Sequence, residues 1–168
     1  VMDCCAGTQQ IWTRLRSEFP VERYIGFDRQ HRPGTVRADS ARWLRDVGVS
    51  GNVVDIDTYG EPWEHYSAVC AAVWPHPEIV VFLTIGTGLK ALGRLSKHAL
   101  EASGLKGEWS ALVPPSYALR AICADCLLAT CYDNGIICVA GYEAGFNGTR
   151  HIGLWLRKVE EAHVKGSA

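Results

Sequence analysis

Short apolar segments alternate with amphipathic segments along most of this chain, and this alternation constrains the fold more than any other feature. Apolar side chains recur at helical spacing in residues 9–19, and residues 79–85 form an apolar run of strand length. Such a run is typical of a strand buried on both faces of a parallel sheet. We therefore predict an α/β fold: an open, mostly parallel sheet with helices on both faces.

The same pattern predicts the individual elements. The expected strands cover residues 1–6, 24–28, 36–39, 52–56, 79–85, 136–141 and 151–159. The expected helices cover residues 9–19, 40–47, 63–74, 89–103 and 116–132. Between the last two strands, residues 142–150 contain Gly145, Asn147 and Gly148, which indicates a hairpin-like loop.

With 168 residues, of which 48% are hydrophobic, the chain has the size and apolar content of one domain. We predict a single domain over residues 1–168, in which residues 87–115 are a candidate substrate lid or partner segment. No apolar run approaches the roughly 20 residues of a membrane-spanning helix. The amino terminus lacks the pattern of a secretory signal, and seven cysteines at low density favour the reducing cytoplasm. The net charge of −1 excludes a global basic field, so any nucleic-acid contact must be local.

Polar residues follow the first strand in a tight turn. Asp3 lies at the end of this strand, and the small residues Ala6 and Gly7 let a ligand approach backbone amides before the next helix starts at about Thr8. The turn is therefore a candidate binding site for a cofactor.

Acidic residues also follow the next two strands. Asp28 ends the second strand, where a carboxylate can accept hydrogen bonds from ribose hydroxyls. Asp39 and Ser40 follow the third strand, and Asp39 can accept a hydrogen bond from an adenine amino group. The alternative is that an acid after a strand caps the following helix.

The fourth strand ends in Asp55-Ile56-Asp57-Thr58-Tyr59-Gly60. Acid-rich ends on four successive strands, with a closing strand pair, resemble the layout of class I S-adenosylmethionine-dependent methyltransferases. The resemblance implies a Rossmann-like, seven-stranded sheet with a reversed last strand and S-adenosyl-L-methionine as cofactor. The residues that it assigns to cofactor binding are Asp3, Ala6, Gly7, Thr8, Asp28, Asp39, Ser40 and Asp55.

The segment from Asp55 to Pro62 is similar to the Asp-x-Asp-Pro-Tyr/Phe-Gly-Ser-Pro signature of tRNA guanine dimethyltransferases. Three positions depart from that family. Thr58 replaces the signature proline, Gln9 stands where a third glycine is usual, and Gly86 stands near the family's acid after the fifth strand. The resemblance covers most of the chain, but the family's separate tRNA-binding domain has no counterpart in it.

The chemistry that this resemblance implies is in-line attack by an exocyclic amine on a sulfonium methyl group, which requires no metal. An aromatic amine is a poor nucleophile, and an acceptor on its hydrogens makes its lone pair more available. We expect the Asp57 carboxylate and the Thr58 carbonyl to be those acceptors, and Tyr59 to stack on the base. The alternative for Tyr59 is an aromatic ring packed on the sheet.

The favoured function is therefore RNA modification at a guanine amine, with RNA as partner and a homo-oligomer or partner protein supplying substrate recognition. A small-molecule methyltransferase would share every cofactor residue. A non-catalytic S-adenosylmethionine-binding or scaffold protein would explain the departures at Gln9, Thr58 and Gly86. A nucleotide-dependent oxidoreductase fits less well, because the first turn has too few glycines.

Overall fold

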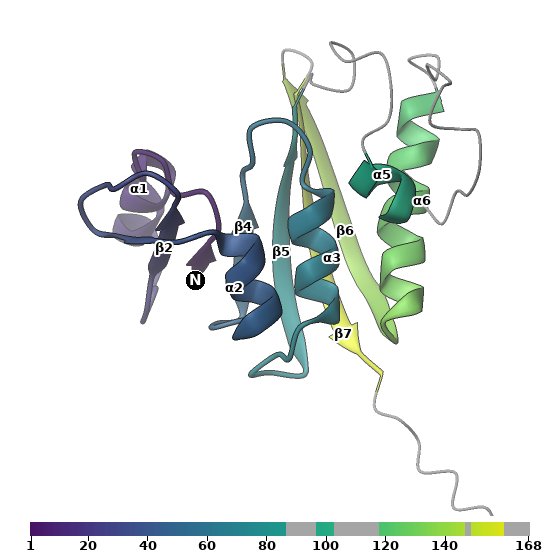
Figure 1. The fold of residues 1–168 in the computed structure, drawn as a ribbon, viewed down its shortest axis with the longest axis horizontal. Helices are drawn as coiled ribbons and strands as arrows, with labels where there is room; N and C mark the ends of the chain where they lie inside the picture. The colour runs from purple at the N-terminus through teal and green to yellow at the C-terminus, as the bar shows by residue number, and fades with distance from the viewer. Residues whose placement is uncertain (87–96, 103–117, 147–148, 160–168) are drawn as a thin grey trace, which may run out of the picture.

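The computed structural model describes residues 1–86, 97–102, 118–146 and 149–159. Within these ranges the strands form a seven-stranded sheet in the order β3-β2-β1-β4-β5-β7-β6 (Figure 1). The strands are β1 (Met2–Asp3), β2 (Ile25–Asp28), β3 (Thr35–Arg37), β4 (Val53–Ile56), β5 (Glu78–Ile85), β6 (Ile136–Phe146) and β7 (Thr149–Lys158). The expected α/β class and strand succession are confirmed.

Strands β1 to β5 pair in parallel, whereas β7 runs antiparallel to both of its neighbours, β5 and β6. The expectation of a mostly parallel sheet with a reversed last strand is therefore confirmed. The chain builds β1, β2 and β3 outward in one direction and then places β4 on the other side of β1. The carboxyl ends of β1 and β4 thus flank the point where the strand order reverses.

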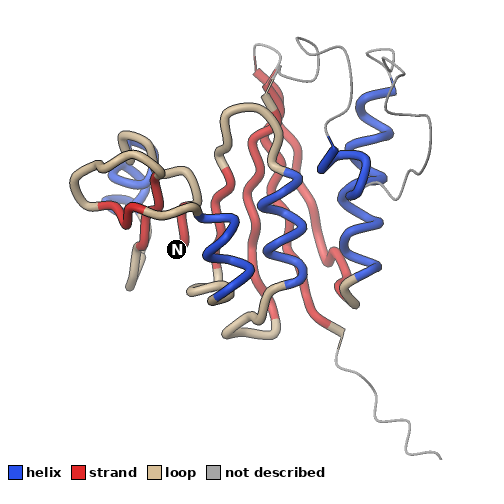
Figure 2. The backbone as a smooth tube through the Cα atoms, in the orientation of Figure 1, coloured by secondary structure: helices blue, strands red, loops and turns tan. Residues whose placement is uncertain are grey.

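The described helices are α1 (Gln10–Glu18), α2 (Ser40–Asp46), α3 (Trp63–Ala71), α5 (Lys97–Ala102) and α6 (Ala118–Asp133). Figures 1 and 2 show α2 and α3 in front of the sheet and α1 behind it. The side chains of β4 agree with this, because Asp55 bonds to α1 whereas its neighbours Val54 and Ile56 are buried in the cluster that contains Trp63 of α3. Helices therefore lie on both faces of the sheet, as successive strand side chains point to opposite faces.

The main core lies between the sheet and helices α3, α5 and α6. Strand β5 contributes Ile79, Val81, Leu83 and Ile85, all buried, to this core. The side chains between them face the other side, where Phe82 is 43% exposed. The expectation that this strand is buried on both faces is therefore wrong for the described residues, because α1 covers the β1 side of that face and leaves β5 open.

The boundaries of the last two strands differ from expectation. The predicted loop over residues 142–150 is mostly strand, because β6 continues to Phe146 and β7 starts at Thr149, with Arg150 and Glu143 forming an ion pair of 2.7 Å. Helix α2 is capped by Asp39, whose side chain accepts a hydrogen bond from the amide of Arg42. The expected helix over residues 89–103 is described only at Lys97–Ala102, and the rest of the candidate lid lies outside the described residues. None of the described helices has the length and apolar character needed to cross a membrane.

Candidate active site

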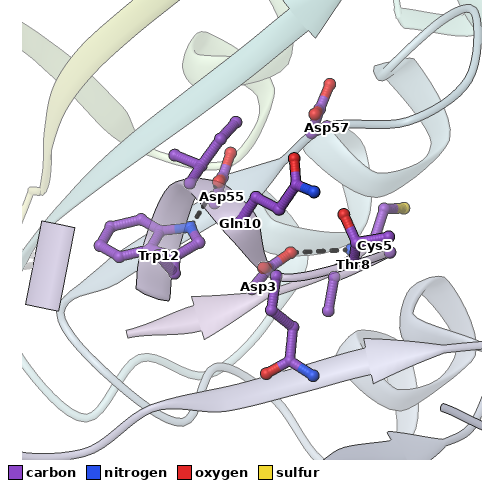
Figure 3. Close-up of a pocket in the computed structure, with 11 residues that line it drawn as sticks. Asp3, Cys5, Thr8, Gln10, Trp12, Asp55 and Asp57 are labelled. Atoms are coloured by element: carbon purple, nitrogen blue, oxygen red, sulfur yellow. Dashed lines mark hydrogen bonds between the residues drawn. The ribbon is translucent and has the colours of Figure 1, made fainter. Parts of the chain in front are cut away.

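A pocket of about 220 Å³ opens at the carboxyl ends of β1 and β4. Ligands of open α/β sheets bind at such a reversal of strand order. Figure 3 shows three carboxylates, Asp3, Asp55 and Asp57, around this pocket. The described residues of its lining are Asp3, Cys5, Ala6, Gly7, Thr8, Gln9, Gln10, Ile11, Trp12, Asp55 and Asp57. The structure therefore brings the first turn and the fourth-strand acids together, as the sequence predicts.

The turn after β1 is held by main-chain hydrogen bonds to both neighbouring strands. The Cys4 amide donates to the Asp55 carbonyl at 2.8 Å, and the Ala6 amide donates to the Phe27 carbonyl at 2.9 Å. Gly7 and Gln9 have φ angles of 49° and 58°, in the left-handed region that favours glycine. Gln9 thus adopts the backbone conformation of the glycine that it replaces, and its side chain donates to the Pro33 carbonyl at 2.8 Å.

Two of the carboxylates, the buried Asp3 and the half-buried Asp55, already hold protein hydrogen bonds. Asp55 accepts from the indole of Trp12 at 2.6 Å, and Asp3 accepts from the Tyr24 hydroxyl at 2.8 Å. The pKa of Asp55 is raised to about 7. Burial is the main cause and the charges of Asp3 and Asp57 add to it, whereas the hydrogen bond from Trp12 opposes the shift. Burial also raises the pKa of Asp3. Among the described residues the lining has no lysine, arginine or histidine, and its three carboxylates favour a ligand that carries positive charge.

Asp28 and Asp39 lie outside the lining of this pocket. Asp28 accepts from the Arg32 guanidinium at 2.8 Å, and Asp39 accepts from that of Arg29 at 2.7 Å. The hydrogen bond from the Arg42 amide lowers the pKa of Asp39, so the helix-cap alternative accounts for one of its oxygens. The Ala6 amide donates to the carbonyl of Phe27, the residue before Asp28, so the end of β2 lies beside the turn.

Ser40 is buried and contacts the turn from behind. Its hydroxyl donates to the Cys4 carbonyl at 2.5 Å and lies 2.9 Å from Nε2 of His65. Because the single hydroxyl hydrogen is directed at Cys4, Nε2 of His65 is the donor to Ser40. Burial lowers the pKa of His65, which favours the neutral ring. Ser40 therefore positions the turn, and His65 is a supporting residue that the sequence reasoning missed because it lies within an apolar helical pattern.

The loop after β4 presents its side chains differently. Asp57 lines the pocket, Thr58 is half-buried, and Tyr59 is fully exposed, so its ring does not pack on the sheet. Gly60 has a φ of 116°, and its carbonyl accepts from the Gly86 amide at 2.9 Å. The end of β5 thus holds the loop that carries Asp57.

Cys5 and Trp12 also line the pocket. Burial raises the pKa of the Cys5 thiol to about 12, so this thiol is a poor nucleophile near neutral pH. The sequence places Trp12 on the apolar face of a helix, and no sequence signal distinguishes its indole N–H from that of a core tryptophan.

The strand order, the reversed β7 and a pocket at the β1–β4 reversal together define the class I methyltransferase fold. No family model and no curated protein matches the sequence. Among solved structures, the chain is similar to Trm1 from Pyrococcus horikoshii in complex with S-adenosyl-L-methionine, with a TM-score of 0.69 and 12% identity over 94% of this chain. It spans about half the length of that protein, 50%.

Two further solved structures share the fold. A putative methyltransferase, yhhF from Escherichia coli, has a TM-score of 0.54 and 12% identity, over 95% of this chain and 76% of its own. A putative hemolysin from Streptococcus thermophilus has the same TM-score, 0.54, and 12% identity, over 95% of this chain and 58% of its own. At such low identity these likenesses establish the fold.

Proposed function

We propose that this chain is an S-adenosylmethionine-dependent methyltransferase that acts on an exocyclic amine of a nucleic-acid base, with RNA guanine as the favoured target. The observation that carries the proposal is that Asp57, from the signature-like segment after β4, lines the same pocket as the turn after β1. The candidate cofactor site thus lies next to a carboxylate that can accept a hydrogen bond from the substrate amine. The likeness to Trm1, which was crystallised with S-adenosyl-L-methionine, supports the choice of cofactor.

The charged groups that line the pocket fit this cofactor. S-adenosylmethionine carries a sulfonium and an ammonium group, and the described lining of the pocket offers three carboxylates and no basic side chain. In the proposal Asp3, Asp55 and the turn from Ala6 to Thr8 hold the amino-acid end. Asp28 and Asp39 receive the ribose and the adenine, respectively. The bound cofactor supplies an electrophilic methyl group.

Residues after β4 then orient the base that receives the methyl group. The Asp57 carboxylate accepts a hydrogen from the amine, which makes the nitrogen lone pair more available to the methyl group. The Thr58 carbonyl is the second acceptor in the proposal. The exposed ring of Tyr59 is free to stack on a flat base, a contact worth about 1–3 kcal/mol in single-strand binders.

A small-molecule methyltransferase is the second candidate. It is favoured by the net charge of −1 and by the acidic lining of the pocket, because both disfavour a polyanion. Salt dependence separates the two: binding of an RNA acceptor weakens steeply with salt, whereas binding of a neutral metabolite does not.

The test combines calorimetry with S-adenosylmethionine and its demethylated product, S-adenosylhomocysteine, and a tritiated-methyl assay on bulk RNA, DNA and metabolites. We expect Asp57→Ala to keep the affinity for S-adenosylhomocysteine within about twofold while turnover falls roughly 100-fold or more. Asp46→Ala is the matched control, because Asp46 is an exposed acid that pairs with Arg42 on α2. Wild-type turnover in Asp57→Ala would contradict the role of Asp57 as hydrogen-bond acceptor for the amine. Absence of binding of S-adenosylmethionine and of S-adenosylhomocysteine would contradict the proposal that the chain is a methyltransferase.

A further inference from the structure

A second pocket, of about 350 Å³, lies beside the first and shares four lining residues with it: Ile11, Trp12, Asp55 and Asp57. Its remaining walls come from Leu15 of α1 and from β5, β6 and β7, on the face of the sheet that α1 covers only in part. We call it the aromatic pocket. Because Trp12 and the two acids line both pockets, the aromatic pocket is adjacent to the candidate cofactor site.

The floor of the aromatic pocket is formed by one residue from each of three adjacent strands. Phe82 of β5 is the register partner of Gly153 of β7, which is in turn the partner of Tyr142 of β6. A Cβ at Gly153 would lie 3.2 Å from the Phe82 ring, so the missing side chain lets this ring lie against the middle strand. Phe82 and Tyr142 are 43% and 75% exposed, so both rings are open to contact with a ligand.

Polar groups stand at the rim of this apolar floor. Thr84 Oγ1 lies 3.2 Å from His151 Nδ1 at the β5–β7 end of the pocket, and Asp57 stands at the cofactor end. The described part of the lining contains no lysine or arginine. Apolar ring surfaces with a few hydrogen-bonding groups suit a flat heterocycle, whereas the two carboxylates disfavour a phosphate.

We propose that the aromatic pocket holds the ring of the methyl acceptor: an uncharged, flat heteroaromatic ring that lies against Phe82 and Tyr142, with its amine edge toward Asp57. This inference rests on the proposed function, because only a cofactor in the first pocket makes the ring an acceptor. It adds the residues that select the acceptor, and it keeps any phosphate of that acceptor outside the pocket.

The test uses 2-aminopurine riboside, a neutral fluorescent nucleoside with an exocyclic amine, added to the protein saturated with S-adenosylhomocysteine. We expect its fluorescence to be quenched on binding, and its Kd to rise about tenfold in Phe82→Ala and in Tyr142→Ala. The affinity for S-adenosylhomocysteine should stay within about twofold of wild type. The 5′-monophosphate of the probe should bind no more tightly than the nucleoside.

Trp155→Ala is the matched control. Trp155 pairs with Val80 and therefore lies on the same face as Phe82, with a similar exposure of 42%, but it does not line the aromatic pocket. This variant should bind the probe as wild type does. Thermal unfolding of all three variants verifies that each is folded.

The failures are distinguishable. Absence of S-adenosylhomocysteine binding would overturn the proposed function and with it the acceptor role of this pocket. Only the present inference is overturned if S-adenosylhomocysteine binds but the probe does not. The same holds if the probe binds equally to wild type and to the Phe82 and Tyr142 variants. A changed oligomeric state in Phe82→Ala with unchanged probe affinity would also overturn it, since the face would then be a protein contact.

Discussion

The indole Nε1 of Trp12 donates a 2.6 Å hydrogen bond to Oδ2 of Asp55, and this bond joins helix α1 to strand β4 in the wall between the two pockets. The carboxylate is half-buried and has a pKa raised to about 7 despite the bond. Its ionisation therefore opposes folding, and its charge near neutral pH depends on what occupies the pocket.

The first prediction concerns stability against pH. Because the pKa of Asp55 is higher in the folded than in the unfolded chain, the folded state binds more protons between about pH 4 and pH 7. Asp55 therefore makes the free energy of unfolding fall as pH rises through this range. We expect Asp55→Asn, which keeps an acceptor for Trp12, to be more stable than wild type by about 1–3 kcal/mol at pH 8 and nearly equal at about pH 4. Urea unfolding at both pH values measures this, and an equal difference at both would contradict it.

The second prediction concerns the charge of the cofactor and rests on the proposed function. S-adenosylmethionine carries a sulfonium charge that S-adenosylhomocysteine lacks. The affinity for S-adenosylmethionine relative to that for S-adenosylhomocysteine should rise from about pH 5.5 to pH 8, because the Asp55 carboxylate ionises over this range and favours the sulfonium cation. Calorimetry at several pH values measures the ratio. In Asp55→Asn this affinity ratio should be much less dependent on pH. If the pH dependence persists unchanged in this variant, a group other than Asp55 causes it.

The third prediction concerns Gln9. An L-residue in the left-handed region costs about 1–2 kcal/mol, which glycine avoids, although glycine also loses more chain entropy on folding and here loses the bond to Pro33. We expect Gln9→Gly to leave the free energy of unfolding within about 1 kcal/mol of wild type. Gln9→Val, with a branched side chain, should lower it by about 1–2 kcal/mol. Arg14→Gly, in the middle of α1, is the control and should cost about 1 kcal/mol.

The fourth prediction concerns Asp28 as ribose acceptor. Asp28→Ala should weaken S-adenosylhomocysteine binding by about 1–3 kcal/mol, the cost of leaving buried hydroxyls unpaired. The control is Arg32→Ala, which removes the ion-pair partner of Asp28 but keeps the carboxylate. It should bind at least as tightly as wild type. Equal losses in both variants would mean that the ion pair, and not the carboxylate, matters.

The fifth prediction concerns Asp39 and adenine. Asparagine retains an oxygen that can cap α2, so Asp39→Asn separates a cofactor role from the helix cap. We expect the variant to lose preference for adenosyl over inosyl analogues of the cofactor product, measured by competition. If the preference is retained while the protein stays folded, Asp39 acts as a helix cap and ion-pair partner of Arg29 only.

Periodicity and turn residues are local properties, and they were sufficient to predict the succession of strands. The reversed β7 was predicted from the resemblance to the methyltransferase family. The sequence could not predict that β5 exposes Phe82, since an apolar run reads the same whether or not a helix covers its second face. The ion pairs of Asp28 and Asp39 were equally unpredictable, because they depend on how the loop after β2 folds back. For the site, the sequence identified the acids but not Trp12, whose indole N–H matters only once β4 lies beside α1.

The hydrogen bond between Gly86 and Gly60 also limits how this chain can change through evolution. A Cβ at Gly86 would lie 3.3 Å from the Gly60 carbonyl oxygen, and Gly60 itself has a φ of 116°, which other residues rarely adopt. An acid at Gly86, near where the tRNA guanine dimethyltransferases carry one, would therefore push on the loop that holds Asp57. Such a substitution is tolerable only after the loop has already shifted, so the order in which mutations arise decides whether that acid can be acquired.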